Sequence, residues 1–229
     1  MTPGARNGPA GDRYALASWL YDLATAGWSG GAIWRTRQEV LRHCEPGAEL
    51  LVPGPGSGRL AVEAARRGLR VTAVERSPRM LARARRRAER AGAEVDLRLG
   101  DVRDLPVEPT FDAVALEHFL NVFHRDEMER VRERMIARVR PGGVLAIADF
   151  APLDPTASVL ARAAQRVHHV TPLGGCALLT GNAMHPIYDH GRDLAGRADL
   201  RLEATVDAPS FGVGPRWFRS WVFRRQGAA

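Results

Sequence analysis

The sequence predicts an α/β protein in which helices cover a mostly parallel β-sheet. The chain has 229 residues and is 45% hydrophobic, which is enough for one globular domain with a sizeable core. From Glu49 onward, short apolar runs rich in β-branched residues alternate with helical patterns of Ala, Leu and Arg. Alternation of this kind is typical of strand–helix–strand units, and Gly and Pro mark the turns between them.

The expected elements follow one another in a regular order. Five strands are expected first: Glu49–Val52, Arg70–Glu75, Glu94–Leu99, Phe111–Leu116 and Val144–Asp149. The helices expected between them are Arg59–Arg67, a helix that Ser77 caps and Pro78 opens, and Arg125–Arg138, which ends at the turn Arg140-Pro141-Gly142-Gly143. Two more helices, Thr156–His169 and Asp189–Gly196, precede a terminal hairpin of Leu200–Asp207 and Arg216–Arg224.

The chain is strongly basic, yet its charge does not identify a partner. Its 33 basic residues exceed its 26 acidic residues by seven, a balance that often accompanies binding to nucleic acid. Every basic residue is Arg and none is Lys, which is typical of a GC-rich genome. In the helix that Pro78 opens, apolar residues share one face while the arginines fall mostly elsewhere, as on a solvated surface. Nucleic acid is therefore not the expected partner.

The sequence carries no sign of secretion, a membrane span or a metal centre. Cys44 and Cys176 match no metal or redox spacing, so a reduced, cytoplasmic compartment is expected and no metal is. Residues 1–12 lack the apolar core of a signal peptide and are expected to form a flexible tail. No apolar run approaches the roughly 18 residues that a membrane span needs.

A glycine-rich loop is the most informative stretch of the sequence. Gly54-Pro55-Gly56-Ser57-Gly58 lies between an expected strand and an expected helix, where open α/β sheets bind small molecules. The dinucleotide fingerprint requires glycine at its first, third and sixth positions, but here the sixth position is the bulky Arg59. The loop therefore indicates either a different ligand or a purely structural tight turn.

Acidic residues at the ends of the next two expected strands favour a ligand. Glu75 lies 17 residues beyond Gly58, where a carboxylate can accept hydrogen bonds from both hydroxyls of a ribose. Asp101, in Gly100-Asp101-Val102, follows the third strand, where it can accept from the exocyclic amine of an adenine. One such acid is more often a helix cap or a surface charge, but this spacing on successive strands predicts an adenosine site.

Taken together, these residues resemble the class I S-adenosylmethionine (SAM)-dependent methyltransferases over about Leu50–Asp149. The segment Val71–Leu81 is similar to the family's second strand and following helix. Gly100-Asp101-Val102, Phe111-Asp112-Ala113-Val114 and Val139-Arg140-Pro141-Gly142-Gly143 are similar to its later motifs. The resemblance implies a Rossmann-like fold with a mostly parallel seven-stranded sheet, a terminal antiparallel strand and SAM as cofactor. It also implies a helical N-terminal lid at 13–45, and a methyltransferase domain at 46–229 with an acceptor-side insertion at about 155–190. The alternative for the lid is an amphipathic helix whose aromatic residues only pack against the core.

The resemblance also assigns roles to individual residues. The cofactor-binding residues that it implies are Tyr21 in the lid, Gly54, Gly56 and Gly58 beneath the methionine, Glu75 and Arg76 at the ribose, Asp101 and Val102 at the adenine, and Glu117 near the methionine end. One position departs from the family. The acid usually found two residues before the first glycine is Val52 here, which leaves open how the amino group of the cofactor is held.

A general base is needed only where the methyl acceptor must lose a proton. The residues expected to act catalytically are His118, after the fourth strand, and His185 with Tyr188 in the insertion. The alternative for each is a structural hydrogen-bonding role. His124 and His190 are weaker candidates for a base.

The expected function is methyl transfer to a small, hydrophobic or quinone-like molecule, by similarity to quinone-biosynthesis methyltransferases. An RNA or protein methyltransferase is the alternative enzyme, although Leu116-Glu117-His118-Phe119 stands where amino-methylating enzymes carry Asn/Asp-Pro-Pro-aromatic. A protein that binds SAM without turnover is the alternative from another class, and a homodimer is a further possibility.

Overall fold

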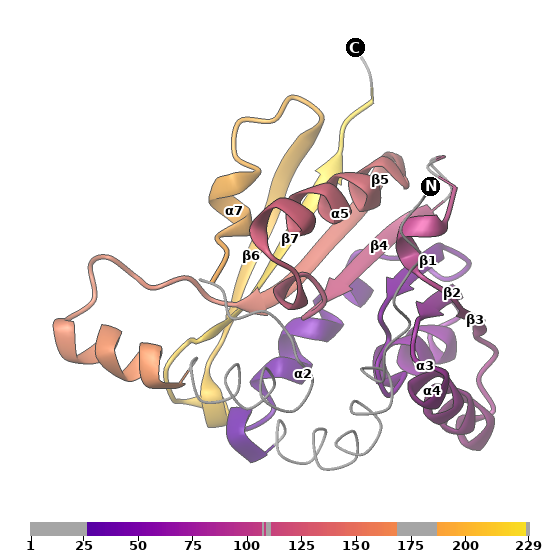
Figure 1. Cartoon of the computed structure of the whole chain (residues 1–229), viewed down its shortest axis with the longest axis horizontal. Helices are drawn as coiled ribbons and strands as arrows, with labels where there is room; N and C mark the ends of the chain where they lie inside the picture. The colour runs from indigo at the N-terminus through magenta and orange to yellow at the C-terminus, as the bar shows by residue number, and fades with distance from the viewer. Residues whose placement is uncertain (1–26, 107, 109–110, 169–186, 228–229) are drawn as a thin grey trace, which may run out of the picture.

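The structure is a computed structural model that describes residues 27–106, 108, 111–168 and 187–227 (Figure 1). Its seven strands form one sheet in the order β3-β2-β1-β4-β5-β7-β6. Their bounds are β1 Glu49–Pro53, β2 Arg70–Glu75, β3 Asp96–Leu99, β4 Phe111–Glu117, β5 Val139–Phe150, β6 Leu200–Ala208 and β7 Phe218–Arg225. β1 to β5 are parallel, whereas β7 runs antiparallel to both of its neighbours. This is the Rossmann-like sheet, with its antiparallel strand near the end of the chain, that the sequence predicted.

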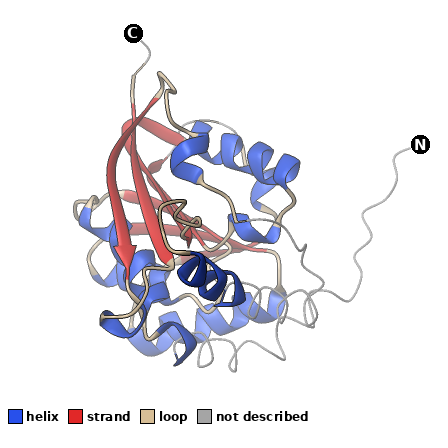
Figure 2. Cartoon of the chain, turned by 90° about the vertical axis from the view of Figure 1, so that its left-hand side faces the viewer, coloured by secondary structure: helices blue, strands red, loops and turns tan. Residues whose placement is uncertain are grey.

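The apolar strands are buried on both faces, because helices cover both sides of the sheet (Figure 2). Leu50 and Val52 of β1 pack into one core cluster, while Leu51 between them packs into another on the opposite face. Strands covered on both faces are nearly continuous in apolar residues, as these are. The helices described are α2 Ala32–Arg37, α3 Arg59–Arg66, α4 Pro78–Ala91, α5 Arg125–Ala137, a helix at 159–168, and α7 His190–Asp193.

Local signals set the boundaries of α4. The Ser77 hydroxyl accepts a hydrogen bond from the Met80 amide, Pro78 occupies the first turn, and Gly92 ends the helix in a left-handed conformation. Four short 3₁₀ turns complete the elements: η1 Gln38–Arg42, η2 Val102–Asp104, η3 Leu120–Val122 and η4 Ser210–Gly212.

β5 is longer than the sequence predicted. It begins at Val139 rather than Val144, so the Pro141-Gly142-Gly143 turn lies inside the strand. Val139 already pairs with Phe111, and the register then shifts at a bulge between Phe111 and Ala113, which accommodates the extra residues. Other ends differ less: β3 begins at Asp96, the helix expected from Thr156 begins at 159, and α7 covers only His190–Asp193.

Much of the excess positive charge is held in ion pairs. Arg140 bridges Glu49 and Asp112, and Arg197 bridges Glu133 and Asp199. In α4 the buried residues are Leu81, Ala84 and Ala88, which leaves its arginines toward the surface. Within the ranges that the structure describes, no helix is both long and apolar enough to cross a bilayer.

Candidate functional site

The predicted site residues meet at one edge of the sheet. The glycine loop follows β1, Glu75 ends β2, Asp101 follows β3 and Glu117 ends β4. These four strands are parallel neighbours, so their carboxyl ends lie side by side. In open α/β sheets this edge is where small ligands bind.

The loop between β1 and α3 requires its glycines. Gly54, Gly56 and Gly58 have φ angles of 58°, 57° and 77°, in the left-handed region that side chains disfavour. A Cβ atom on Gly54 would lie 2.8 Å from the Phe119 ring, and one on Gly58 would lie 2.8 Å from Cβ and 3.0 Å from Cα of Ala84. The absence of a side chain at Gly54 and Gly58 therefore lets the loop pack closely against Phe119, which follows β4, and against α4.

Replacing Gly58 by alanine is expected to lower the free energy of unfolding by about 2–4 kcal/mol. The left-handed backbone and the contact with the α4 backbone act together, because Ala84 Cα cannot move away alone. Gly92→Ala is the matched control, since Gly92 has φ 59° but no atom within 4 Å of the added Cβ. Urea denaturation followed by circular dichroism measures both variants. Equal losses in the two would contradict the close approach of α3 and α4.

The Glu75 carboxylate is fixed at the base of the loop. The residue is 8% exposed, and its Oε1 accepts a hydrogen bond of 2.9 Å from the Ser77 amide. Burial raises the pKa of Glu75, and the backbone amides of Ser77 and Gly56 partly offset this by favouring the ionised form. The carboxylate is thus held in one place beside Gly56, with acceptor sites to spare for a ligand.

The Asp101 carboxylate is already engaged by Arg103. Oδ1 accepts from the Arg103 amide and Nε, both at 2.9 Å, and Oδ2 accepts from the Arg103 guanidinium as well. These hydrogen bonds hold the pKa of Asp101 below its ordinary value. A carboxylate offers roughly four acceptor sites, so one remains on Oδ2 for an amine. Val102 is buried in the core beside it, whereas Arg76 is exposed.

Glu117 presents a buried carboxylate that has no hydrogen-bond partner among the described residues. The residue is 7% exposed, and neither Oε1 nor Oε2 has a hydrogen-bond partner in the structure. Burial raises the pKa of Glu117 well above its ordinary value, although the positive charge of Arg37 acts in the opposite direction. An unpaired buried charge is costly, so this carboxylate is suited to a cationic ligand.

Glu117 lies on the same face of the sheet as Val52, the position that lacks the expected acid. Val52 packs into the cluster that also contains Ala113 and Ala115 of β4. Alternate residues of a strand share a face, so Glu117 projects to the side of Ala113 and Ala115. β1 and β4 are paired neighbours, so the carboxylate that β1 lacks at Val52 is present on β4 at Glu117.

His118 is held in a strained conformation beside Glu117. Its φ angle is 52°, in the left-handed region, and its amide donates to the Ala148 carbonyl at 2.7 Å. The side chain is 4% exposed and its Nε2 has no hydrogen-bond partner in the structure. Burial lowers the pKa of His118 to about 3, and Arg37 acts in the same direction, so the ring is neutral at physiological pH.

An aromatic cluster surrounds the His118 ring. Its centroid lies 5.6 Å from that of Phe150 and 6.1 Å from that of Phe218. Trp28 packs edge-on against Phe218 and stacks on His168, with 3.9 Å between the ring centroids. The centroid of His168 in turn lies 3.8 Å from that of Trp217. Flat, apolar rings therefore cover the side of His118 that faces Phe150 and Phe218.

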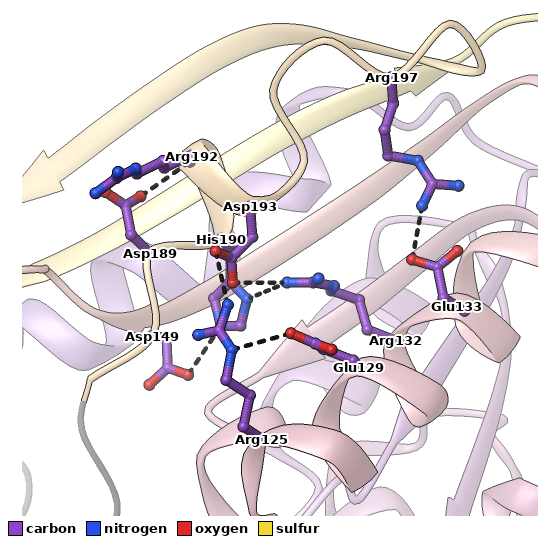
Figure 3. A network of polar contacts seen from close by, with 10 residues as sticks. All are labelled: Arg125, Glu129, Arg132, Glu133, Asp149, Asp189, His190, Arg192, Asp193 and Arg197. Carbon is purple, nitrogen blue, oxygen red and sulfur yellow. Dashed lines mark hydrogen bonds and ion pairs between the residues drawn. The ribbon is translucent and has the colours of Figure 1, made fainter.

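Sequence reasoning missed Asp149, which ends the apolar run of β5. Its carboxylate is 4% exposed and accepts from Asn121 Nδ2 at 2.9 Å and from the Phe150 amide at 2.8 Å. His190 Nε2 lies 3.4 Å from its Oδ2 (Figure 3). The one signal in the sequence was a charged residue at the end of the apolar run 144–148.

The remaining predicted residues are placed as follows. Tyr21 and His185 lie outside the described residues. The Tyr188 hydroxyl donates to the Phe123 carbonyl at 3.0 Å and its ring is buried in the core. In the part of the expected lid that is described, Arg59 stacks over the Trp34 ring at 3.8 Å, joining α2 to α3. No group of three or more His, Cys, Asp or Glu residues suited to a metal ion occurs among the described residues.

Comparison with known proteins agrees with this architecture. Residues 51–143 match the model of a methyltransferase domain family. A ubiquinone biosynthesis O-methyltransferase of Methylocella silvestris is 34% identical over 172 residues, which cover 72% of this chain and 59% of that protein. A second, from Xanthomonas axonopodis pv. citri, is 34% identical over 109 residues, covering 46% of this chain and 45% of the relative. The chain thus spans about half the length of these relatives.

Solved structures share the fold over nearly the whole chain. The Burkholderia thailandensis 1,6-didemethyltoxoflavin-N1-methyltransferase, with bound 1,6-didemethyltoxoflavin and S-adenosylhomocysteine, has a TM-score of 0.66 at 19% identity, covering 99% of this chain and 94% of that one. The [4+2]-cyclase SpnF has a TM-score of 0.68 at 18% identity, covering 95% of both chains. The chain thus contains a methyltransferase domain at residues 51–143 and has the fold of the class I SAM-dependent methyltransferases.

Proposed function

We propose that this protein transfers the methyl group of SAM to a small, hydrophobic acceptor. The observation that carries the proposal is the pair of buried acids, Glu75 and Glu117, on either side of the glycine loop. Their residue types match the two ends of the cofactor: one acid beside the loop for ribose hydroxyls, and one unpaired acid for a cation. Gly56 lies between them, and a Cβ added there would meet only Met80 Cε, at 3.9 Å, so the loop backbone can be approached by a ligand at this position.

In this proposal each described residue has a chemical task. Glu75 accepts from the ribose hydroxyls, and the free site on Asp101 Oδ2 accepts from the adenine amine. Glu117 faces the ammonium group of the methionine portion and replaces the acid that is absent at Val52. The bound cofactor supplies a methyl group that its positively charged sulfur already activates.

His118 is the proposed general base. Because its ring is neutral, Nε2 has a lone pair, and that atom has no other partner in the structure. As the acceptor atom bonds to the methyl group, its proton passes to His118 Nε2. The aromatic cluster of Trp28, Phe150, Trp217 and Phe218 excludes water and offers planar surfaces to an apolar acceptor.

The acceptor class is inferred from two sources. The aromatic cluster beside His118 favours a flat, apolar molecule over a nucleic acid strand, which is bound by exposed positive charge. The curated relatives are named for ubiquinone biosynthesis and O-methylation, in keeping with an aromatic hydroxyl acceptor.

Incubation with methyl-labelled SAM and a panel of phenols, catechols and flat nitrogen heterocycles is expected to give a labelled product. His118→Gln is expected to lower kcat by about 100- to 10,000-fold on a hydroxyl acceptor, the usual contribution of a general base, with SAM affinity little changed. His124→Gln is the matched control, because His124 is exposed to solvent at the start of α5, away from the buried site of His118. The rate of this variant is expected to match that of the unaltered chain. Equal rates in the unaltered chain and in His118→Gln would remove the base from the mechanism.

One observation supports a second candidate, a protein that binds SAM without transferring its methyl group. The fold is shared with SpnF, a [4+2]-cyclase, and a fold by itself does not determine the reaction. Tight SAM binding with no labelled product from any acceptor or cell extract would favour this candidate over the first.

A further inference from the structure

Four polar residues behind His118, three of them buried and one half-buried, form a hydrogen-bonded chain that leads away from the proposed reaction centre. It runs from Asp149 to His190 on α7 and from there to Arg132 on α5 (Figure 3). Asn121 joins it at Asp149. All of these elements meet only in the folded protein, since α5 and α7 are separated by the insertion and β5. None of the tasks described so far uses this chain.

The hydrogen-bonding chemistry of arginine fixes the proton on His190. Arg132 NH1 lies 3.2 Å from His190 Nδ1, and a guanidinium can only donate. Nδ1 of His190 must therefore accept, which places the ring proton of a neutral imidazole on Nε2. That Nε2–H points to Asp149 Oδ2, 3.4 Å away. Arg132 thus sets the orientation of His190, and the hydrogen bond from His190 in turn orients the Asp149 carboxylate.

Asp149 is consequently held as an anion in one orientation. It receives hydrogen bonds from Asn121 Nδ2, the Phe150 amide and His190 Nε2. Burial alone would raise the pKa of Asp149, but the hydrogen bonds from His190 and Asn121 help to hold it below its ordinary value. Hydrogen bonds to a buried carboxylate stabilise its charged form in this way.

The Asp149 carboxylate also faces the His118 ring. Asp149 Oδ1 lies 3.9 Å from His118 Nδ1, beyond hydrogen-bond length but close enough for a strong electrostatic effect in a buried site. A lone pair on Nδ1 facing this anion is disfavoured, whereas an N–H facing it is favoured. Among the described residues, Arg37 also acts on the charge of the ring, Glu117 precedes His118 in the chain, and the rings of Phe150 and Phe218 lie nearby.

We infer that Asp149 is a positioning residue for His118, and that it keeps the proton of the neutral His118 ring on Nδ1 so that Nε2 carries the lone pair. This inference rests on the proposed role of His118 as a base. Arg132 and His190 belong to the same device, because they fix the orientation of Asp149. The tautomer is therefore set by the fold before an acceptor binds.

The tautomer can be measured directly on the full chain. In long-range ¹H–¹⁵N spectra of the protein with ¹⁵N-labelled histidine, protonated and unprotonated ring nitrogens have widely separated shifts. The chain has seven histidines, and His118→Gln identifies the His118 signals. At pH 7 we expect Nδ1 protonated and Nε2 unprotonated, opposite to the tautomer that histidine favours in water. A proton on Nε2 in the unaltered chain would overturn the inference without any variant.

Asp149→Asn tests whether the charge of Asp149 sets the tautomer of His118. Removing the charge is expected to shift the His118 proton largely or wholly to Nε2, and His190→Gln is expected to give a smaller shift in the same direction. Glu129→Gln is the matched control, because it makes the same carboxylate-to-amide change where the carboxylate pairs with the exposed Arg125. The tautomer of His118 is expected to stay unchanged in this variant. An unaltered tautomer in a folded Asp149→Asn variant would also overturn the inference.

SAM binding, measured by calorimetry on the same samples, separates this inference from the proposed function. Normal SAM binding with the wrong tautomer rejects only the positioning role of Asp149. The expected tautomer in a chain that does not bind SAM rejects the proposed function and leaves the positioning of His118 intact.

Discussion

Glu75→Ala is expected to weaken SAM binding by at least about 100-fold, measured by calorimetric titration. Two hydrogen bonds from ribose hydroxyls to a charged carboxylate each contribute about 1.5–3 kcal/mol, and every 1.4 kcal/mol is a factor of ten in Kd. The substitution also removes the acceptor of the Ser77 amide, which loosens the turn that shapes the site.

Two further variants make the Glu75 result specific. Glu63→Ala removes a carboxylate from α3, where it pairs with Arg67 at the surface, and is expected to leave SAM affinity unchanged. Glu75→Gln retains the shape and one acceptor oxygen, so a loss of about tenfold is expected. Undiminished binding in a folded Glu75→Ala variant would reject the assignment of this residue to the ribose.

Glu117→Gln is expected to weaken SAM binding by about 10- to 100-fold and to remove part of its pH dependence. In the free protein, burial raises the pKa of Glu117 well above its ordinary value of 4.5, so the carboxyl stays protonated at a higher pH than usual. The ammonium group of SAM favours the ionised form, so binding releases a proton and becomes tighter as the pH rises. This trend ends at the pKa that Glu117 has in the free protein.

The proton release is measured by calorimetry in buffers of different ionisation enthalpy, between about pH 5 and 7, where the ammonium group of SAM stays charged. Up to about one proton per cofactor is expected from the unaltered chain, and less from Glu117→Gln. Burial also raises the pKa of Glu75, so the difference between the two chains, rather than the total, isolates Glu117. The same proton release in both would show that Glu117 does not face the ammonium group.

The part of the fold that was predictable from sequence is the part where local signals and burial agree. β2 spans Arg70–Glu75 as expected, and Ser77 and Pro78 mark the start of α4 as expected. β5 was misjudged because Pro141 and Gly142 normally end elements. Only pairing with Phe111 on another strand makes Val139 part of the sheet.

The same limit applies to the site. In the sequence, Glu75 ends one expected strand and the glycine loop directly follows another. Their positions at strand ends therefore predicted that they lie together. Arg132 looks like one more charged residue on a solvated helix, yet it is 4% exposed and contacts His190, 58 residues away. Contacts of that kind depend on how α5 and α7 pack on the sheet, which no local pattern records.

The direction of β7 has a practical consequence for attaching labels to the protein. Phe218, at its start, pairs with Phe150 at the site edge of the sheet, and Arg224 pairs with Val144 toward the opposite edge. Eight residues of strand, at about 3.3 Å each, carry the chain roughly 26 Å from the cofactor loops before Gln226. A resin, a surface or a bulky dye joined beyond Gly227 would therefore stand clear of the cofactor entrance, so immobilised protein is suited to binding measurements.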